Sequence, residues 1–112
     1  MPNNNPSNPP NGTYTSNCGA DFSSWDGSFT YTDGAIAYTR TSPSGTYNTS
    51  NTSNGNAIVF DLTDTSVTPN QTVQFNGSSF AYQPGNKAQY SGNCHNRGPA
   101  AGEDAWTATQ SS

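Results

Sequence analysis

Acid–base and nucleophilic chemistry would have to draw on very few side chains in this chain. It has one histidine, His95, one glutamate, Glu103, and one lysine, Lys87. A catalytic triad would need His95, but a loop-like Asn-Arg-Gly run follows it and no nucleophile elbow accompanies it. Hydrolysis by paired carboxylates would draw on residues such as Asp26 and Asp33, each of which precedes a glycine and is typical of a turn. We therefore expect no enzymatic activity.

The two cysteines, Cys18 and Cys94, lack the CxxC or Cys/His spacing of a metal site. A disulfide between them is the simplest interpretation, and two free buried thiols are the alternative. The bond would close a loop of about 76 residues. In the chain-entropy model such a loop stabilises the folded state by roughly 4–5 kcal/mol.

Hard oxygen ligands for calcium are the one metal chemistry that the composition permits. Asp61 and Asp64, with the neighbouring threonines, are weak candidates for a loop site. No EF-hand or repeat-type calcium loop is present, so solvated loop carboxylates are the alternative. No other cofactor is predicted.

Aromatic side chains supply a second candidate site. Trp25 with Asp26 in Ser-Ser-Trp-Asp-Gly, together with Tyr14 and Tyr82, could stack on sugar rings and hydrogen-bond their hydroxyl groups. The competing interpretation places both tryptophans in the core, because Leu, Ile, Val and Phe together contribute only eleven residues.

Uncharged polar residues dominate the composition. Fifteen Asn, fifteen Ser, fifteen Thr and eleven Gly make up half of the 112 residues, and only ten residues are charged, with a net charge of −4. Three basic residues are too few for a phosphate-binding track, so nucleic acid is not a predicted partner. No apolar stretch approaches the ~18 residues needed to span a membrane, so membrane insertion is not predicted either.

The chain divides into an arm and one domain. Residues 1–11 are rich in proline and asparagine and contain nothing suited to a core, which predicts an extended arm that contacts a neighbour. The residues assigned to this contact are Pro2, Asn5, Pro6, Pro9 and Pro10. Residues 12–112 form the single predicted domain.

Short strand signals recur along this domain, and the clearest is a hairpin. Asp33-Gly34 favours a two-residue type I′ turn, which would place Tyr31 opposite Ile36 and Phe29 opposite Tyr38. Further strands are expected at 12–16, 57–62, 71–75, 79–83, 88–91 and 105–109, with turns that include Asn54-Gly55, Asn76-Gly77 and Pro84-Gly85.

Seven to eight short antiparallel strands with one apolar face predict an all-β fold, either a β-sandwich or a jelly roll. A β-solenoid is the alternative, but no fixed repeat supports it. Several strands carry Thr-x-Thr triplets, which resemble ice-binding strands: Thr13–Thr15, Thr30–Thr32, Thr39–Thr41 and Thr107–Thr109. Their irregular spacing along the chain does not predict a flat lattice.

A surface that forms hydrogen bonds without charge, a small core and a Pro/Asn-rich arm suit a protein that packs against neighbours. The leading hypothesis is a non-enzymatic structural subunit at the surface of an extracellular assembly, such as a virion decoration protein or an appendage or filament subunit. Its partners would be copies of itself or another surface protein, reached through the arm and the sheet edges. The alternative is a secreted carbohydrate-binding module or lectin that uses exposed aromatic residues.

Overall fold

The fold was analysed in a computed structural model that describes residues 8–42, 44–50 and 57–111. The strands are β1 (Gly12–Cys18), β2 (Gly27–Thr32), β3 (Ala35–Arg40), β4 (Gly45–Ser50), β5 (Ile58–Asp64), β6 (Gln71–Gln83), β7 (Lys87–Gly98) and β8 (Glu103–Gln110). One 3₁₀ helix, η1 (Ala20–Trp25), follows β1. No described helix has the length and apolar character needed to cross a membrane.

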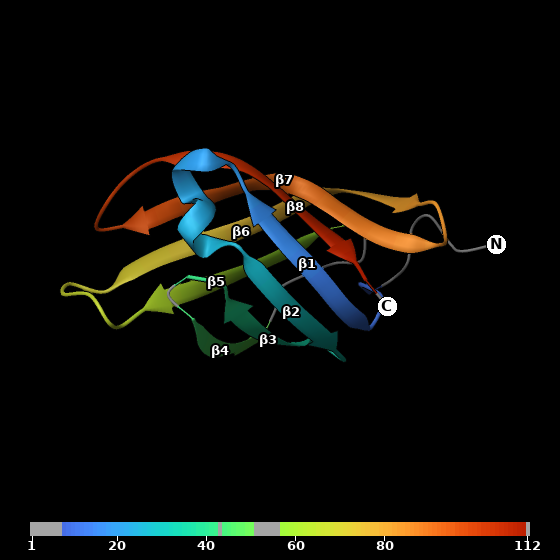
Figure 1. The fold of residues 1–112 in the computed structure, drawn as a ribbon, viewed down its shortest axis with the longest axis horizontal. Coiled ribbons are helices and arrows are strands. Elements are labelled where there is room, and N and C mark those ends of the chain that lie inside the picture. Colours follow the sequence, from blue (N-terminus) through green and yellow to red (C-terminus); the bar gives the residue numbers. More distant parts are fainter. Residues whose placement is uncertain (1–7, 43, 51–56, 112) are drawn as a thin grey trace.

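The strands form one antiparallel sheet in the order β4-β3-β2-β1-β8-β7-β6-β5. Each half of the chain is a four-stranded meander, and pairing of β1 with β8 joins the halves. Among the described strands, β4 and β5 are the only two that follow each other in the chain without being hydrogen-bonded to each other, although they lie near each other. The sheet therefore curls into a nearly closed barrel with one seam between β4 and β5 (Figure 1).

This arrangement confirms the all-β antiparallel class and differs from the predicted sandwich or jelly roll. A sandwich needs two sheets that pack face to face, whereas all eight strands here belong to one sheet. Alternation of apolar and polar residues is the same in both architectures, because each has one buried and one exposed face. The pattern therefore predicts strands without predicting how their sheet closes.

The predicted β2–β3 hairpin is confirmed residue by residue. Tyr31 pairs with Ile36 and Phe29 pairs with Tyr38. Asp33 and Gly34 at the turn have φ values of 50° and 95°. Both values lie in the left-handed region that a type I′ turn requires at its two central residues.

Strand β6 corrects the prediction of a turn at Asn76-Gly77. The two short strands expected on either side are one strand, with a bulge between Gly77 and Ser79. The extra residue shifts the alternation, so Phe80 and Tyr82 pack against the same core as the residues before the bulge. Likewise β7 extends beyond 88–91 as far as Gly98, so His95 lies on a strand rather than in a loop.

The barrel interior is filled mainly by aromatic rings. Among the largest fully buried side chains are Trp106, Tyr14, Tyr38, Tyr90, Phe29 and Phe75. Phe29 stacks on Tyr14 with ring centroids 4.9 Å apart, and Phe60 stacks on Phe75 at 5.0 Å. Gly77 leaves room for this packing, because a Cβ there would lie 3.1 Å or less from Ile58, Tyr90 and Trp106. An eight-stranded barrel is just wide enough to be filled in this way.

Polar atoms within this core form a chain of hydrogen bonds. The Trp106 indole Nε1 donates to Ser16 Oγ at 2.7 Å, and Ser16 Oγ lies 2.8 Å from the Tyr38 hydroxyl. Tyr38 donates its single hydrogen to the Trp25 carbonyl at 2.6 Å, so Ser16 is the donor in the Ser16–Tyr38 pair. The chain ties β8, β1 and β3 to η1 and satisfies groups that would be costly to bury unpaired.

A buried ion pair spans the seam. Arg40 at the end of β3 is 3% exposed, and its Nη1 lies 3.0 Å from Asp64 Oδ2 at the end of β5. The guanidinium also lies 3.9 Å from the centre of the Trp25 ring and donates twice to the Ser24 carbonyl. Asp64 in turn accepts from the Ser66 backbone N–H at 2.9 Å. One side chain thus links β3, η1 and β5 where strand pairing is missing.

Replacing Arg40 with alanine is expected to destabilise the fold by about 3–5 kcal/mol, because Asp64 would stay buried without its charged partner. Arg97→Ala is the matched control, since the Arg97–Asp61 pair is half exposed and should contribute only about 0–1 kcal/mol. Urea denaturation measures both changes. The loss of stability in Arg40→Lys, which keeps the charge, should lie between the losses in the two alanine variants. Equal losses for the two alanine variants would contradict this role.

Asp64 should also make stability depend on pH. Hydrogen bonds from Ser66, and then Arg40, hold the pKa of Asp64 below its usual range. A carboxyl group with a lower pKa in the folded than in the unfolded state stabilises fully above its unfolded pKa of about 3.9. That stabilisation is lost as the pH falls through the folded pKa. Unfolding free energies measured at several pH values should decrease below about pH 4, and Asp64→Asn should flatten this decrease. An unchanged slope in the variant would contradict the assignment.

Candidate functional site

The predicted cysteine pair comes together near η1. Cys18 at the end of β1 is half-buried and Cys94 in β7 is buried, and both are free thiols in this structure. A hydrogen bond to Cys94, together with burial, raises the pKa of the Cys18 thiol. The juxtaposition matches the prediction, and the disulfide itself remains a prediction.

The predicted sugar-stacking residues do not form an exposed platform. Trp25 is 7% exposed and Tyr14 is 0% exposed, and both belong to the core cluster. Asp26 accepts the Cys18 backbone N–H at 2.6 Å, and half-buried Tyr82 packs against Phe80. These residues therefore stabilise the barrel. For Trp25 this is the core position that the competing interpretation of the tryptophans predicts.

The two calcium candidates also lie apart. Asp61 points outward from β5 and pairs with Arg97 at 2.8 Å, whereas Asp64 points inward and pairs with Arg40. An odd spacing of three residues along a strand places the two carboxylates on opposite faces. No group of three or more potential metal ligands exists among the described residues.

Part of the arm lies against the barrel. Pro9 is buried, and the Pro10 carbonyl accepts the Tyr14 hydroxyl at 2.7 Å. Asn11 exchanges two hydrogen bonds of 3.0 Å with Asp33 at the β2–β3 turn. Pro2, Asn5 and Pro6 lie outside the described residues. Residues 9–11 therefore contact the domain, and contact of the arm with a neighbour remains a proposal.

The described outward residues of β1–β4 and of the second half of β8 form a surface that we call the threonine face, and none of them is charged. Its outward residues are Thr13, Thr15, Asn17, Ser28, Thr30, Thr32, Ala35, Ala37, Thr39, Thr46, Asn48, Thr107 and Thr109. Strand register aligns them in rows, one of which runs Thr109, Thr15, Ser28, Thr39 and Thr46. The triplets that are irregular along the chain are thus ordered in space, on a surface that follows the curve of the barrel.

A shallow hollow of about 570 Å³ interrupts the threonine face. Ala35 and Ala37 of β3 line it between Thr30 and Thr32 on one side and Asn48 on the other. The small alanine side chains leave room there for a side chain of another molecule.

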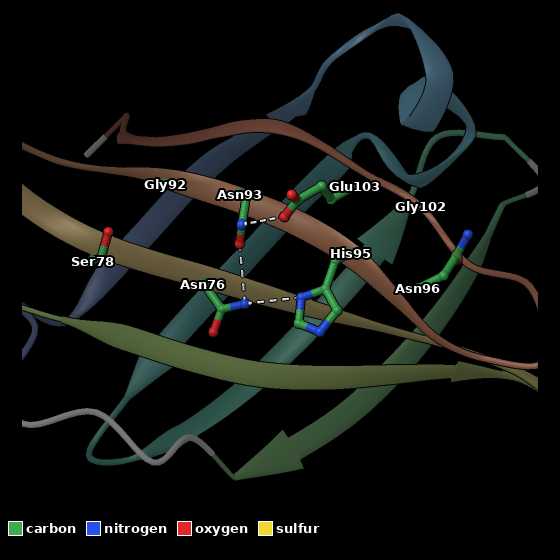
Figure 2. A pocket seen from close by; sticks show the side chains of 8 residues that line it. All are labelled: Asn76, Ser78, Gly92, Asn93, His95, Asn96, Gly102 and Glu103. Atoms are coloured by element: carbon green, nitrogen blue, oxygen red, sulfur yellow. Dashed lines mark hydrogen bonds between the residues drawn. The ribbon is translucent and has the colours of Figure 1, made fainter.

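A polar groove of about 790 Å³ lies on the other side of the barrel, on the outer surface of β6, β7 and β8. Four side chains form a connected network in it (Figure 2). The Asn76 amide nitrogen lies 3.2 Å from both Asn93 Oδ1 and His95 Nδ1. Asn93 donates to Glu103 Oε2 at 2.8 Å.

Sequence patterns missed this groove because its residues gather only through register. Asn76 pairs with Asn93 across β6 and β7, and His95 pairs with Glu103 across β7 and β8. Predicting a turn at Asn76 and a loop at His95 separated residues that adjacent strands bring together. The one signal in the sequence was that Asn93 and His95 are polar residues at alternating positions of one segment.

Comparison with known proteins finds no matching protein-family model, no matching curated protein and no matching solved structure. The function must therefore be argued from the surfaces described above.

Oxidation should join Cys18 to Cys94. With glutathione disulfide as oxidant, the two thiols lose two protons and two electrons to form one S–S bond, and the oxidant is reduced to two glutathione thiols. Intact mass should fall by two hydrogens, and thiol labelling in denaturant should find no free cysteine. Stability should rise by up to roughly 4–5 kcal/mol over the reduced protein. Two labelled thiols after oxidation would contradict the pairing, and Cys18→Ser serves as the control that leaves one thiol free.

Proposed function

We propose that the protein is a non-enzymatic structural subunit that packs against copies of itself through the threonine face, at the surface of an extracellular assembly. Virion decoration proteins and the subunits of appendages or filaments are structural subunits of this kind. The observation that supports it is the absence of charge on the outward residues of β1–β4 and the second half of β8.

Charge placement favours a second copy as the occupant. The chain carries a net charge of −4, so contact through the acidic parts of two copies would bring like charges together. The described acidic residues lie on η1, on turns, in the core and on the outer surfaces of β5 and β8. Two threonine faces can meet without repulsion and without the cost of burying an unpaired charge.

Threonine and asparagine suit such a contact chemically. Their hydroxyl and amide groups both donate and accept hydrogen bonds, so two copies of one surface can be complementary to each other. The hollow at Ala35 and Ala37 offers a recess for a protruding side chain of the neighbour. Many weak directional contacts of this kind become strong when a subunit repeats them across an assembly.

The arm and the sheet edges are the other proposed contacts. The seam leaves β4 and β5 as the two edges of the sheet, and such edges accept an added strand. Pro9 is buried and the Pro10 carbonyl accepts a hydrogen bond from Tyr14, so removal of these two residues would disturb the barrel itself. Truncation experiments should therefore start the chain at Asn8 rather than after Pro10.

Ala37→Lys should weaken self-association at least about tenfold, because it places an unpaired charge in the middle of the proposed contact. Ala101→Lys is the control, since Ala101 is an exposed alanine between β7 and β8, away from the threonine face. Sedimentation equilibrium over a range of concentrations measures both variants and the chain that starts at Asn8. A wild-type protein that stays monomeric, or an Ala37→Lys variant that associates normally, would overturn the proposal.

A further inference from the structure

The polar groove on β6–β8 contains unused hydrogen-bonding groups that the proposed packing surface does not involve. The groove shares no strand with the hollow, and β8 contributes Glu103 to the groove but Thr107 and Thr109 to the threonine face. Its volume of about 790 Å³ falls in the range of small-molecule sites. Gly92 of β7 and Gly102, just before β8, are among its lining residues.

The network inside the groove determines which groups face a ligand. Both hydrogens of the Asn76 amide are directed within the protein, one to Asn93 Oδ1 and one to His95 Nδ1. His95 Nδ1 is therefore an acceptor, so a neutral His95 carries its hydrogen on Nε2. Glu103 uses Oε2 to accept from Asn93.

Among the described residues of the groove, four polar side-chain atoms have no hydrogen-bond partner. They are two acceptors, Asn76 Oδ1 and Glu103 Oε1, and two groups that can donate, His95 Nε2–H and the Ser78 hydroxyl. Figure 2 shows the Asn76, Asn93 and His95 side chains gathered over β6 and β7, with Glu103 reaching toward Asn93. The hydrogen bonds among Asn76, Asn93, His95 and Glu103 hold these four side chains in place before a ligand arrives.

We propose that this groove binds a neutral carbohydrate, with Asn76 Oδ1 and Glu103 Oε1 accepting hydrogen bonds from its hydroxyl groups and His95 Nε2–H donating one to them. Sugar hydroxyl groups each donate and accept, so neighbouring hydroxyls match a mixed set of donors and acceptors. None of the described residues that line the groove is a lysine or arginine, and Glu103 would repel an anion, so phosphate and acidic sugars are disfavoured. This site uses none of the aromatic residues that the sequence suggested for sugar stacking.

The lining predicts binding rather than hydrolysis of the sugar. Glycoside hydrolysis generally requires two carboxyl groups on either side of the scissile bond, and among the described residues Glu103 is the one carboxylate that lines the groove. Without a stacked aromatic ring, a single site should bind in the millimolar range. Repetition of the subunit in an assembly would raise the total affinity without any new contact.

The test is a titration of ¹⁵N-labelled protein with the methyl glycosides of glucose, galactose, mannose and N-acetylglucosamine, followed by ¹H–¹⁵N NMR. At least one glycoside should shift the signals of residues in the groove, including the side-chain amides of Asn76 and Asn93. Glu103→Ala and Asn93→Ala should weaken binding at least about tenfold, because each removes or releases a charged hydrogen-bond partner. Asn48→Ala is the control, since Asn48 is an exposed asparagine in the hollow on the threonine face.

Thermal unfolding of each variant checks that the barrel is still folded. A loss of binding in a folded variant can then be assigned to the groove. Shifts caused equally by glycerol, shifts confined to the threonine face, or no shift with any of the four glycosides would overturn the proposal. So would stronger binding of inorganic phosphate than of any neutral sugar. The proposal is independent of self-association, because Ala37→Lys should leave these shifts unchanged.

Discussion

Closure of a single sheet is the constraint on which the rest of this structure depends. Hydrogen bonds join the described strands at seven strand pairs, and β4 and β5 are not paired with each other. Arg40 spans that seam with a charged group held on three sides, by Asp64, by the Trp25 ring and by the Ser24 carbonyl. The same contacts hold η1 against the end of the barrel. The aromatic core is protected from water only if this seam stays shut, so a core of mostly uncharged rings depends on a buried ion pair at its edge.

The core solves the problem posed by a chain with few aliphatic residues. Large rings fill an interior that branched aliphatic side chains occupy in most barrels, and each ring buries more area for its position in the chain. Tyrosine and tryptophan bring polar atoms with them. Ser16 accepts the indole hydrogen of Trp106 and continues the chain to Tyr38, so these atoms are satisfied where water cannot reach them.

The sequence was most informative where two local signals coincide. At Asp33-Gly34 the turn residues and the alternation on both sides require one register, and the structure has that register. At Asn76-Gly77 the same kind of signal was misleading, because a bulge in a long strand uses the residues that also form turns. Sheet closure, the alignment of threonines in rows and the groove around His95 all depend on pairing between distant segments. No local pattern contains that information, although the partnership of Cys18 and Cys94 followed from there being only two cysteines.

Pairing of β1 with β8 has a consequence for the connectivity of the chain. Ser111 donates its backbone N–H to the Thr13 carbonyl at 2.7 Å, so the start of β1 and the end of β8 lie side by side. The seam is formed instead by β4 and β5, the first and last strands in the sheet order. A circularly permuted gene that joins these ends and opens between β4 and β5 would keep every strand pair of the native register. Conversely, the original chain leaves β1 without its second neighbour until the last strand has been synthesised, so the barrel is completed only after translation reaches β8.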